Sequence, residues 1–224
     1  MKREVILTAD GSKTIFIPEM DENYHSGHGA LQEAVHVFIR NGLSLYHEKK
    51  EVWVFEMGFG TGLNALLSLI EAEKNGLQVN YTGIEAFPVE EQMAVDMNYP
   101  SLLGEEYRQV FQQLHKMEWD KDHKVTPNFS FRKVFEKIEE HIPQTEQFDL
   151  VYFDAFGPRA QQEMWAPLIL TKMHEMLKPG GALVTYCAKG QVKRDLKAIG
   201  FKIEALPGPL GKREMTRAVK IVNY

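Results

Sequence analysis

Apolar residues in this chain fall into short continuous runs that alternate with stretches where they recur every three or four positions. Short continuous runs are typical of strands buried on both faces, whereas the three-to-four spacing is typical of amphipathic helices. Their alternation predicts an α/β fold with a mostly parallel, seven-stranded sheet, to which a terminal strand pair adds one antiparallel edge strand. The predicted strands cover residues 52–56, 79–84, 129–132, 148–153, 182–186, 201–206 and 217–222.

Further elements precede the first of these strands, and helices connect them. Residues 5–8 and 14–17 flank Asp10-Gly11, a dipeptide that strongly favours a tight hairpin turn. We therefore expect a single domain, in which a β-hairpin and a helix within residues 1–45 extend a core at 46–224. The predicted helices cover residues 31–41, 65–70, 134–141, 164–176 and 191–198, with further short helices in an insertion at about 88–126.

Composition narrows the class of protein. The 224 residues suffice for one α/β domain, and 44% hydrophobic with 25% charged residues is ordinary for a globular chain. The single cysteine, Cys187, excludes an internal disulfide and a cysteine metal cluster. No apolar run reaches the roughly 20 residues that span a bilayer, and the first residues lack the apolar core of a signal peptide. We expect a cytoplasmic protein with no membrane partner.

Charge gives a mixed indication about nucleic acid. The formal net charge is −5, so the molecule as a whole does not attract a polyanion. Lysines and arginines gather at 189–197 and 212–220, which fits either a local RNA contact or an ordinary solvated surface. The spacing of His25 and His28 resembles that of metal ligands, but no cysteine lies near them, and we expect no metal site.

A glycine-rich turn follows the first core strand. Gly58-Phe59-Gly60-Thr61-Gly62 connects residues 52–56 to a helix, as in the strand-turn-helix unit that binds nucleotides in doubly wound folds. Glycines two apart let the backbone approach a ligand where a side chain would collide. Tight strand-to-helix turns also use glycine for steric reasons alone, so this motif by itself leaves both interpretations open.

Acidic residues at two strand ends point to a particular ligand. Glu56 stands just before the glycines, where a carboxylate would repel a pyrophosphate but suits a cationic ligand such as S-adenosylmethionine (SAM). Glu85 ends the next strand, where its two oxygens can accept hydrogen bonds from both ribose hydroxyls. The alternative is that Glu56 caps the first helical turn and Glu85 is a solvated strand end.

A third acid follows the strand at 148–153. Asp154-Ala155-Phe156-Gly157-Pro158 looks like the Asp-Pro-Pro-Tyr type of motif found in amino-group methyltransferases. An amine attacks a sulfonium methyl only through a free lone pair, so acceptors on its N–H groups must aim it along the methyl–sulfur bond. Asp154 would supply such an acceptor and Phe156 a pocket wall. Alternatively, Asp154 is a helix N-cap in a turn.

Taken together, these motifs resemble the methyltransferase half of MnmC, the bifunctional enzyme family of tRNA wobble-uridine modification. The resemblance covers nearly the whole chain in matching order. It rests on Tyr24-His25-Ser26, Gly29-Ala30, Glu33, Val37-Phe38, Gly58 to Asn64, Glu85 to Pro88, Phe153 to Pro158, Met164-Trp165 and Gly211 to Met215. It implies a class I, Rossmann-like fold that transfers the SAM methyl group to the amine of 5-aminomethyl-(2-thio)uridine in the tRNA anticodon.

The resemblance also implies roles for single residues. By position, Glu56, Gly58, Phe59, Gly60, Asn64, Glu85 and Asp154 would hold SAM, and Asp154 with Phe156 would face the target amine. Tyr24, Lys212 and Arg213 would lie near the RNA. Two features depart from the family: Ala86 stands where relatives often have lysine, and the place after the third strand, where many SAM enzymes carry an adenine-binding acid, reads Arg132-Lys133.

The bifunctional relatives carry a flavin-dependent domain, for which these 224 residues have neither the length nor a second dinucleotide fingerprint. We therefore expect SAM but no FAD, and an aminomethyl group installed by other enzymes. Three other hypotheses stay open: a methyltransferase of a small-molecule or protein amine, a non-catalytic SAM- or RNA-binding module, and an aminopropyltransferase on the same fold.

Overall fold

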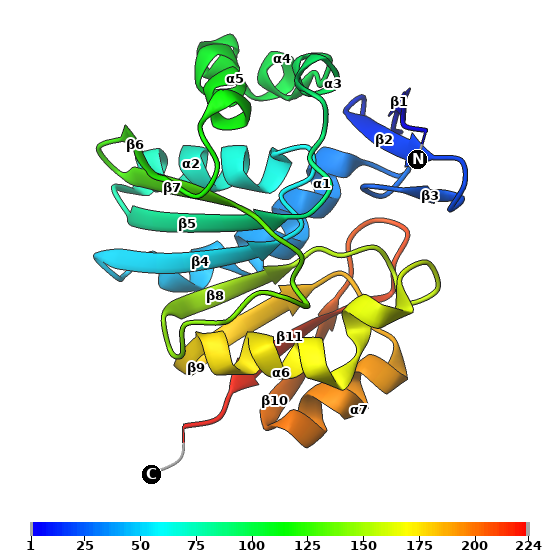
Figure 1. Cartoon of the computed structure of the whole chain (residues 1–224), viewed down its shortest axis with the longest axis vertical. Coiled ribbons are helices and arrows are strands. Elements are labelled where there is room, and N and C mark those ends of the chain that lie inside the picture. Colours follow the sequence, from blue (N-terminus) through cyan, green and yellow to red (C-terminus); the bar gives the residue numbers. More distant parts are fainter. Residues whose placement is uncertain (1, 223–224) are drawn as a thin grey trace.

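A twisted eight-stranded sheet runs through the molecule in the order β10-β11-β9-β8-β4-β5-β7-β6 (Figure 1). The structure is a computed structural model that describes residues 2–222. Neighbouring strands from β9 to β7 are parallel, which confirms the predicted α/β class. The strands are β4 (Glu51–Met57), β5 (Gln78–Glu85), β6 (Asp122–Thr126), β7 (Phe129–Phe135), β8 (Phe148–Phe153), β9 (Leu177–Thr185), β10 (Phe201–Pro207) and β11 (Glu214–Lys220).

The sheet differs from the prediction at both edges. The eighth strand, β6, comes from the end of the predicted helical insertion and pairs antiparallel with β7. At the other edge, the antiparallel strand β11 lies between β9 and β10 and is not the edge strand. Burial agrees with this order, because Met215 and Ala218 of β11 are fully buried, whereas in β10 only Phe201 is buried and the other residues are half-buried or exposed.

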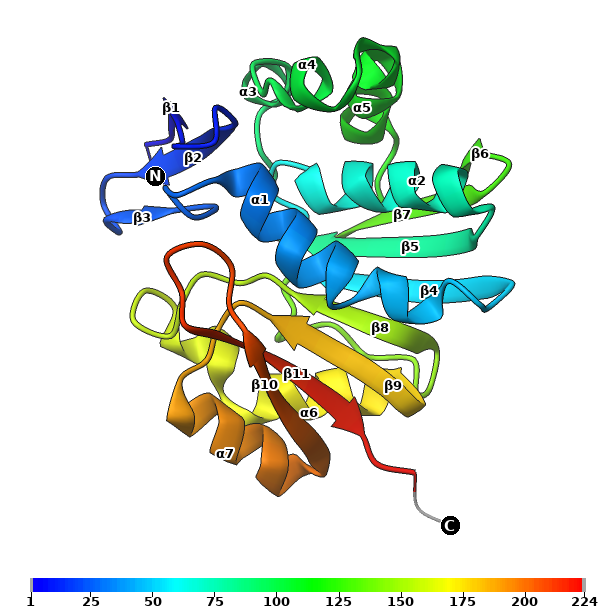
Figure 2. The same ribbon diagram turned by 180° about the vertical axis from the view of Figure 1, so that it is seen from behind.

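Helices cover both faces of the sheet (Figure 2). On one face lie α1 (Ala30–Ala34), its wider-turned continuation η1 (Val35–Arg40) and α2 (Leu63–Asn75). On the other face lie α6 (Pro167–Met176) and α7 (Gly190–Ile199), the latter ending at Gly200 as predicted. The predicted helix at 164–176 is divided, because Pro167 has no backbone N–H and therefore begins a new helix. The short 3₁₀ helices are η2 (Leu43–Tyr46), η3 (Glu105–Tyr107) and η4 (Gln162–Trp165).

The predicted helix at 134–141 does not form. Val134 and Phe135 still belong to β7, and the segment from Glu136 to Gln147 is irregular. The partner of its carbonyl groups explains why this segment is not helical. Lys172 Nζ of α6 donates to the carbonyl oxygens of residues 138, 139 and 141 at 2.9, 2.6 and 2.7 Å. Backbone acceptors that would serve a helix are thereby turned toward a side chain. No helix crosses this part of the sheet.

The predicted hairpin is present and acquires a third strand. β1 (Glu4–Leu7) pairs antiparallel with β2 (Lys13–Ile17), which also pairs with β3 (Glu22–Asn23). Asp10 holds the turn by accepting hydrogen bonds from Ser12, and its second carboxylate oxygen accepts from the backbone N–H of Gln32 at the start of α1. This extension packs beside the carboxyl ends of the central strands (Figure 1).

The insertion after β5 forms α3 (Glu91–Val95), α4 (Tyr99–Leu103) and α5 (Arg108–Lys116), as its apolar stripe predicts. Asn98 connects it to the hairpin, accepting from the backbone of Lys13 and donating to the carbonyl of Gly11, each at 2.8 Å. The hairpin and the insertion therefore support one another. Among residues 2–222, no helix combines the length and the apolar character needed to cross a membrane.

Candidate active site

A cavity of about 470 Å³ opens at the carboxyl ends of β4, β5 and β8 and is walled by the N-terminal extension. Parallel strands end at the same edge, so the three acids predicted to converge do so: Glu56, Glu85 and Asp154 all line it. The other predicted residues that line it are Tyr24, Gly58, Phe59, Gly60, Asn64 and Phe156. Lys212 and Arg213 are not part of its lining.

The glycine-rich turn needs its glycines for conformation and for space. Gly58, Gly60 and Gly62 have φ of 89°, 49° and 74°, in the region that side chains disfavour. A Cβ at Gly60 would lie 3.3 Å from the ring of Tyr24, and one at Gly58 would lie 3.3 Å from the carbonyl oxygen of Asp154. The turn therefore needs glycine for steric reasons at the cavity wall, and the ligand-binding interpretation of the motif stays a prediction.

Glu56 is a buried carboxylate with an unused oxygen. Its side chain is 1% exposed; Oε1 accepts a hydrogen bond from Asn64 Nδ2 at 3.0 Å, and Oε2 has no partner. Burial, together with the negative charge of Asp154, raises the pKa of Glu56 well above its ordinary value. Glu56 does not cap the helix that follows, because α2 receives no side-chain cap bond. A buried carboxylate in this state favours a cationic partner.

Asn64, at the start of α2, joins two of the three acids. Its Nδ2 donates to Glu56 Oε1 and, at 2.8 Å, to Asp154 Oδ2, while its own Oδ1 is buried without a partner. Burial and then the charge of Glu33 raise the pKa of Asp154 to about 7, and the Asn64 hydrogen bond and Lys212 oppose the shift. Asp154 therefore bonds to Asn64 and precedes no helix directly, so it is not an N-cap.

Glu85 binds the backbone on two sides. Its Oε2 accepts from the N–H of Gly60 at 3.0 Å and its Oε1 from the N–H of Phe87 at 2.8 Å. Glu85 is thus more than a solvated strand end, since it connects the glycine-rich turn to the segment after β5. Each carboxylate oxygen retains a second lone pair for a further donor.

Two aromatic side chains form the wall beyond Asp154. Tyr24 and Phe156 meet edge to face with their ring centroids 5.1 Å apart. The backbone around Phe156 is held by two side-chain donors: Trp165 Nε1 donates to the carbonyl of Phe156 at 2.7 Å, and Tyr186 Oη donates to the carbonyl of Ala155 at 2.8 Å. The Asp154–Phe156 segment is therefore fixed before any ligand binds.

The two basic residues expected near RNA differ in environment. Lys212 forms an ion pair with the buried Glu33 of α1, and its Nζ lies 3.9 Å from the ring centroid of Tyr186. Arg213, the next residue, is exposed. Lys212 thus makes its contacts within the chain, with Glu33 and Tyr186, whereas the exposed Arg213 can contact a partner.

Sequence reasoning missed one acid. Because β7 continues to Phe135, the first residue after it is Glu136, and Glu136 lines the cavity. An acid therefore stands directly after β7, three residues beyond Lys133. The alternation of Phe129, Phe131 and Phe135 could have located the true strand end. Glu136 Oε2 forms a 2.7 Å contact with His141 Nδ1.

The two histidines that resemble metal ligands are separated by their environments. His25 is buried, its Nδ1 lies 2.9 Å from Thr14 Oγ1, and burial lowers its pKa to about 4. His28 lies on the surface. Across residues 2–222, no group of three or more His, Cys, Asp or Glu side chains is arranged to hold a metal ion.

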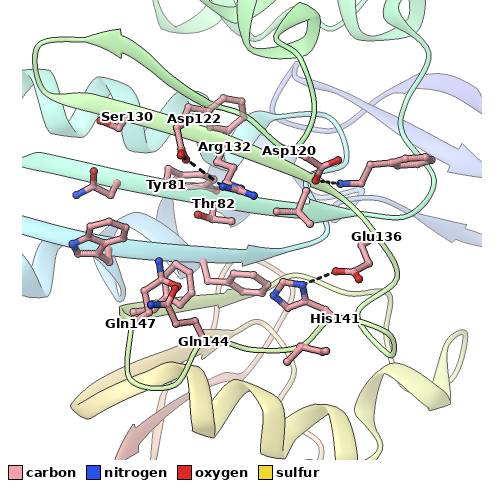
Figure 3. Close-up of a pocket in the computed structure, with 18 residues that line it drawn as sticks. Tyr81, Thr82, Asp120, Asp122, Ser130, Arg132, Glu136, His141, Gln144 and Gln147 are labelled. Carbon is pink, nitrogen blue, oxygen red and sulfur yellow. Dashed lines mark hydrogen bonds and ion pairs between the residues drawn. The ribbon is translucent and has the colours of Figure 1, made fainter.

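A larger cavity, of about 800 Å³, lies on the face of the sheet left open by the missing helix (Figure 3). Most of its charged groups are paired: Arg132 lies 3.6 Å from Asp122, His141 contacts Glu136, and Asp120 accepts from the backbone N–H of Phe135 at 3.4 Å. Tyr81 also borders this cavity, but its hydroxyl lies near Glu56 on the other face of the sheet, where it affects the pKa of that carboxyl. We find no reactive constellation in the larger cavity.

Comparison with known proteins agrees with this geometry. The family model of S-adenosyl-L-methionine-dependent methyltransferases matches residues 101–221. Two relatives, each named tRNA 5-methylaminomethyl-2-thiouridine biosynthesis bifunctional protein MnmC, come from Cupriavidus metallidurans and Cupriavidus necator, with 31% and 29% identity over 96% of this chain. The chain spans about a third of the length of these relatives, 33% and 34%.

Solved structures show the same fold. MNMC2 from Aquifex aeolicus superimposes with a TM-score of 0.80 at 24% identity, covering 100% of this chain and 71% of that one. The CurJ carbon methyltransferase gives a TM-score of 0.50 at 13% identity, over 89% of this chain and 57% of that one. Because the family model covers more than half of its residues, this protein belongs to the family of S-adenosyl-L-methionine-dependent methyltransferases.

Proposed function

We propose that this protein transfers a methyl group from SAM to the primary amine of 5-aminomethyl-(2-thio)uridine at the wobble position of tRNA. The observation that carries the methyl-transfer part is the pair of unpartnered buried acceptors, Glu56 Oε2 and Asn64 Oδ1, among three acids in one cavity. The relatives named for tRNA 5-methylaminomethyl-2-thiouridine biosynthesis, which match 96% of the chain, support the RNA part.

The cavity fits a cationic, phosphate-free donor. An ammonium group is a three-fold donor that suits Glu56 Oε2 and Asn64 Oδ1, neither of which has a hydrogen bond of normal length in the folded chain. Glu85 has lone pairs left for ribose hydroxyls, since its present partners are one backbone N–H on each oxygen. Glu136, directly after β7, is placed to accept from an adenine amino group. A pyrophosphate in the same place would be repelled by the negative charges of these acids.

Asp154 and its surroundings suit the acceptor amine. SAM held in this cavity would supply an electrophilic methyl group, whose carbon–sulfur bond would break with its electron pair staying on sulfur as the amine nitrogen takes the methyl. Asp154 accepts a hydrogen bond from the amine and orients its lone pair. With a pKa of about 7, its carboxylate also holds the proton that the nitrogen gives up near neutral pH. Tyr24 and Phe156 offer aromatic surfaces for the uracil ring.

A methyltransferase acting on a small-molecule or protein amine is the second candidate, and the net charge of −5 favours it. A binding module without catalysis and an aminopropyltransferase are further alternatives. The proposed function requires a preceding reaction that makes a primary amine on the uridine. Arg213 is the exposed basic residue at the loop between β10 and β11 that we propose contacts the RNA.

The test uses the purified chain, labelled SAM and two synthetic anticodon stem-loops that differ only in carrying 5-aminomethyluridine or uridine at the wobble position. We expect label in the aminomethyl stem-loop alone, recovered as 5-methylaminomethyluridine by nucleoside mass analysis. Labelling of small metabolites or proteins instead would support the second candidate, and SAM binding without transfer would support the module. Transfer from decarboxylated SAM to putrescine would identify an aminopropyltransferase.

A matched experiment in cells addresses the same point. Total tRNA from cells lacking this protein should accumulate unmethylated aminomethyluridine, and the wild-type gene should restore the methylated nucleoside. A gene encoding Asp154→Ala should not restore it. Unchanged tRNA nucleosides in the deleted strain would contradict the proposed substrate.

A further inference from the structure

Lys212 reaches from the loop between β10 and β11 to α1 in the N-terminal extension. Its Nζ pairs with Glu33 Oε2, 179 residues away in sequence. The Glu33 side chain is only 8% exposed, whereas that of Lys212 is 32% exposed. A carboxylate buried to this degree requires a cation or several donors, so Lys212 is the partner that makes Glu33 tolerable at this position.

The same lysine contacts the segment that carries the proposed amine acceptor. Its Nζ lies 3.9 Å from the ring centroid of Tyr186, a cation–π distance. The Tyr186 hydroxyl donates to the carbonyl of Ala155 at 2.8 Å, and Ala155 follows Asp154 directly. Lys212 therefore supports the orientation of a ring whose hydroxyl holds the backbone next to Asp154.

Glu33 extends the connection to the opposite wall. Its Oε1 accepts from the backbone N–H of Ser26 at 2.9 Å, in the segment that includes Tyr24 and His25. Tyr24 packs edge to face against Phe156. The Glu33–Lys212 ion pair thus connects both sides of the acceptor half of the cavity, one side through Ser26 and the other through Tyr186.

We propose that Lys212 is a positioning residue for methyl transfer, acting through Glu33 and Tyr186 to hold the Asp154–Phe156 segment and Tyr24 in place. This proposal rests on the proposed function and assigns to Lys212 a task within the chain in place of an RNA contact. Removal of its charge would leave Glu33 buried without a cation, and both walls would shift to hydrate it. Such a shift disturbs the alignment of the amine more than the binding of either substrate.

The kinetic test compares Lys212→Met with Lys212→Arg, which keeps the charge. For Lys212→Met we expect kcat to fall about tenfold, with KM for the stem-loop and the Kd of SAM each within about threefold of wild type. Lys212→Arg should recover most of the loss. The double variant Glu33→Gln/Lys212→Met should lose less than the product of the two single losses, because neither charge is then left alone. Lys202→Met, an exposed lysine on β10, is the control and should retain full activity.

A spectroscopic test keeps this proposal separate from the proposed function. The chain has three tryptophans, and Trp165 Nε1 donates to the carbonyl of Phe156, so its indole N–H signal reports on the acceptor segment. In ¹⁵N-correlated NMR spectra we expect Lys212→Met to displace the Trp165 signal, while the signals of Trp53 and Trp119 stay in place. This result is expected even if the stem-loop proves not to be the substrate.

The competing role gives the opposite pattern. If Lys212 contacts RNA, Lys212→Met will raise KM for the stem-loop at constant kcat, lower the salt dependence of RNA binding by about one charge, and leave the Trp165 signal unmoved. That outcome would overturn the proposal. Should Lys212→Met fail to fold, Tyr186→Phe decides, since it removes only the hydroxyl: a displaced Trp165 signal supports the proposal and an unmoved one refutes it.

Discussion

The cavity over the open face of the sheet and the cavity at the strand ends differ more in chemistry than in size. The larger, about 800 Å³, lies over the open face of the sheet, and its charged side chains have partners, in ion pairs or, for Asp120, in a backbone N–H. The smaller, about 470 Å³, contains Glu56 Oε2 and Asn64 Oδ1, buried acceptors without a hydrogen bond of normal length, although the Tyr81 hydroxyl lies near Glu56. Glu136 borders both.

This difference shows which property identifies a ligand site. The larger cavity exists because Lys172 takes the carbonyls of the segment after β7 and no helix covers the sheet there. It therefore follows from the way the chain folds. In the smaller cavity, the burial of unpaired carboxylate and amide oxygens lowers the stability of the fold. A protein keeps such an arrangement where a ligand supplies the missing donors. The following predictions test that contrast, beginning with the largest effect.

Asp154→Ala should produce the largest loss. It removes the acceptor that aims the amine, so we expect turnover to fall on the order of 100-fold while SAM affinity stays within a few-fold. Single-turnover methyl transfer and calorimetric titration with SAM measure the two quantities. Equal losses in both would make Asp154 a cofactor ligand and not the amine acceptor.

Glu56→Gln should weaken SAM by about 30-fold, since hydrogen bonds to charged groups contribute roughly 1.5–3 kcal/mol. The substitution keeps an oxygen for Asn64 but removes the negative charge that faces the ammonium group. Titration with SAM and with a des-amino analogue provides the control, because the analogue should lose little affinity. An equal loss for both ligands would indicate a general disturbance of the cavity.

Glu85→Ala should weaken SAM about tenfold, mainly through the ribose. Wild-type protein should prefer SAM over its 2′-deoxy analogue, and the variant should bind the two alike. Because Glu85 also accepts from the backbone of Gly60 and Phe87, the glycine-rich turn will loosen somewhat. An unchanged preference between the two ligands would refute the ribose assignment.

Much of the smaller cavity was predictable from the sequence because its acids follow a local rule. Glu56, Glu85 and Asp154 each end a strand, and parallel strands end at one edge. Glu136 escaped because Lys133 interrupts the apolar pattern of β7. Lys133 is nevertheless 1% exposed and donates to the carbonyl of His115 at the end of α5, while burial lowers its pKa to about 8. The carbonyl of His115 in the helical insertion makes position 133 suitable for a lysine. The spacing of residues along the strand does not reveal this distant partner.

Other errors have the same origin in contacts that are distant along the chain. The predicted helix at 134–141 fails because of Lys172, whose Nζ binds its carbonyls. The RNA contact of Lys212 stays a prediction, but its ion pair with Glu33, 179 residues away, was not predictable from local pattern. Periodicity and strand-end motifs report local preferences, whereas these side chains are placed by tertiary partners.

Glu56 should also make the ligand-free protein sensitive to pH. Its pKa is raised in the folded state, so the stability it contributes is complete below the ordinary carboxyl pKa and is lost as pH rises toward the folded value. The Glu56→Gln variant does not lose this stability, because its amide does not ionise. We expect its melting temperature to exceed that of wild type by about 3–6 °C at pH 8, with the difference shrinking toward pH 5. A constant difference across that range would show that Glu56 is not the source.

Arg132→Met should have the smallest effect, and it tests the contrast between the cavities most directly. Arg132 lies on the floor of the larger cavity, its side chain is 42% exposed, and its 3.6 Å contact with Asp122 is a surface ion pair of little energetic weight. We expect SAM affinity, turnover and melting temperature to stay close to wild type, with less than about twofold change in the first two. A tenfold loss of turnover in a variant that folds normally would mean that the larger cavity takes part in the reaction, and unpaired buried acceptors would then no longer suffice to locate the site.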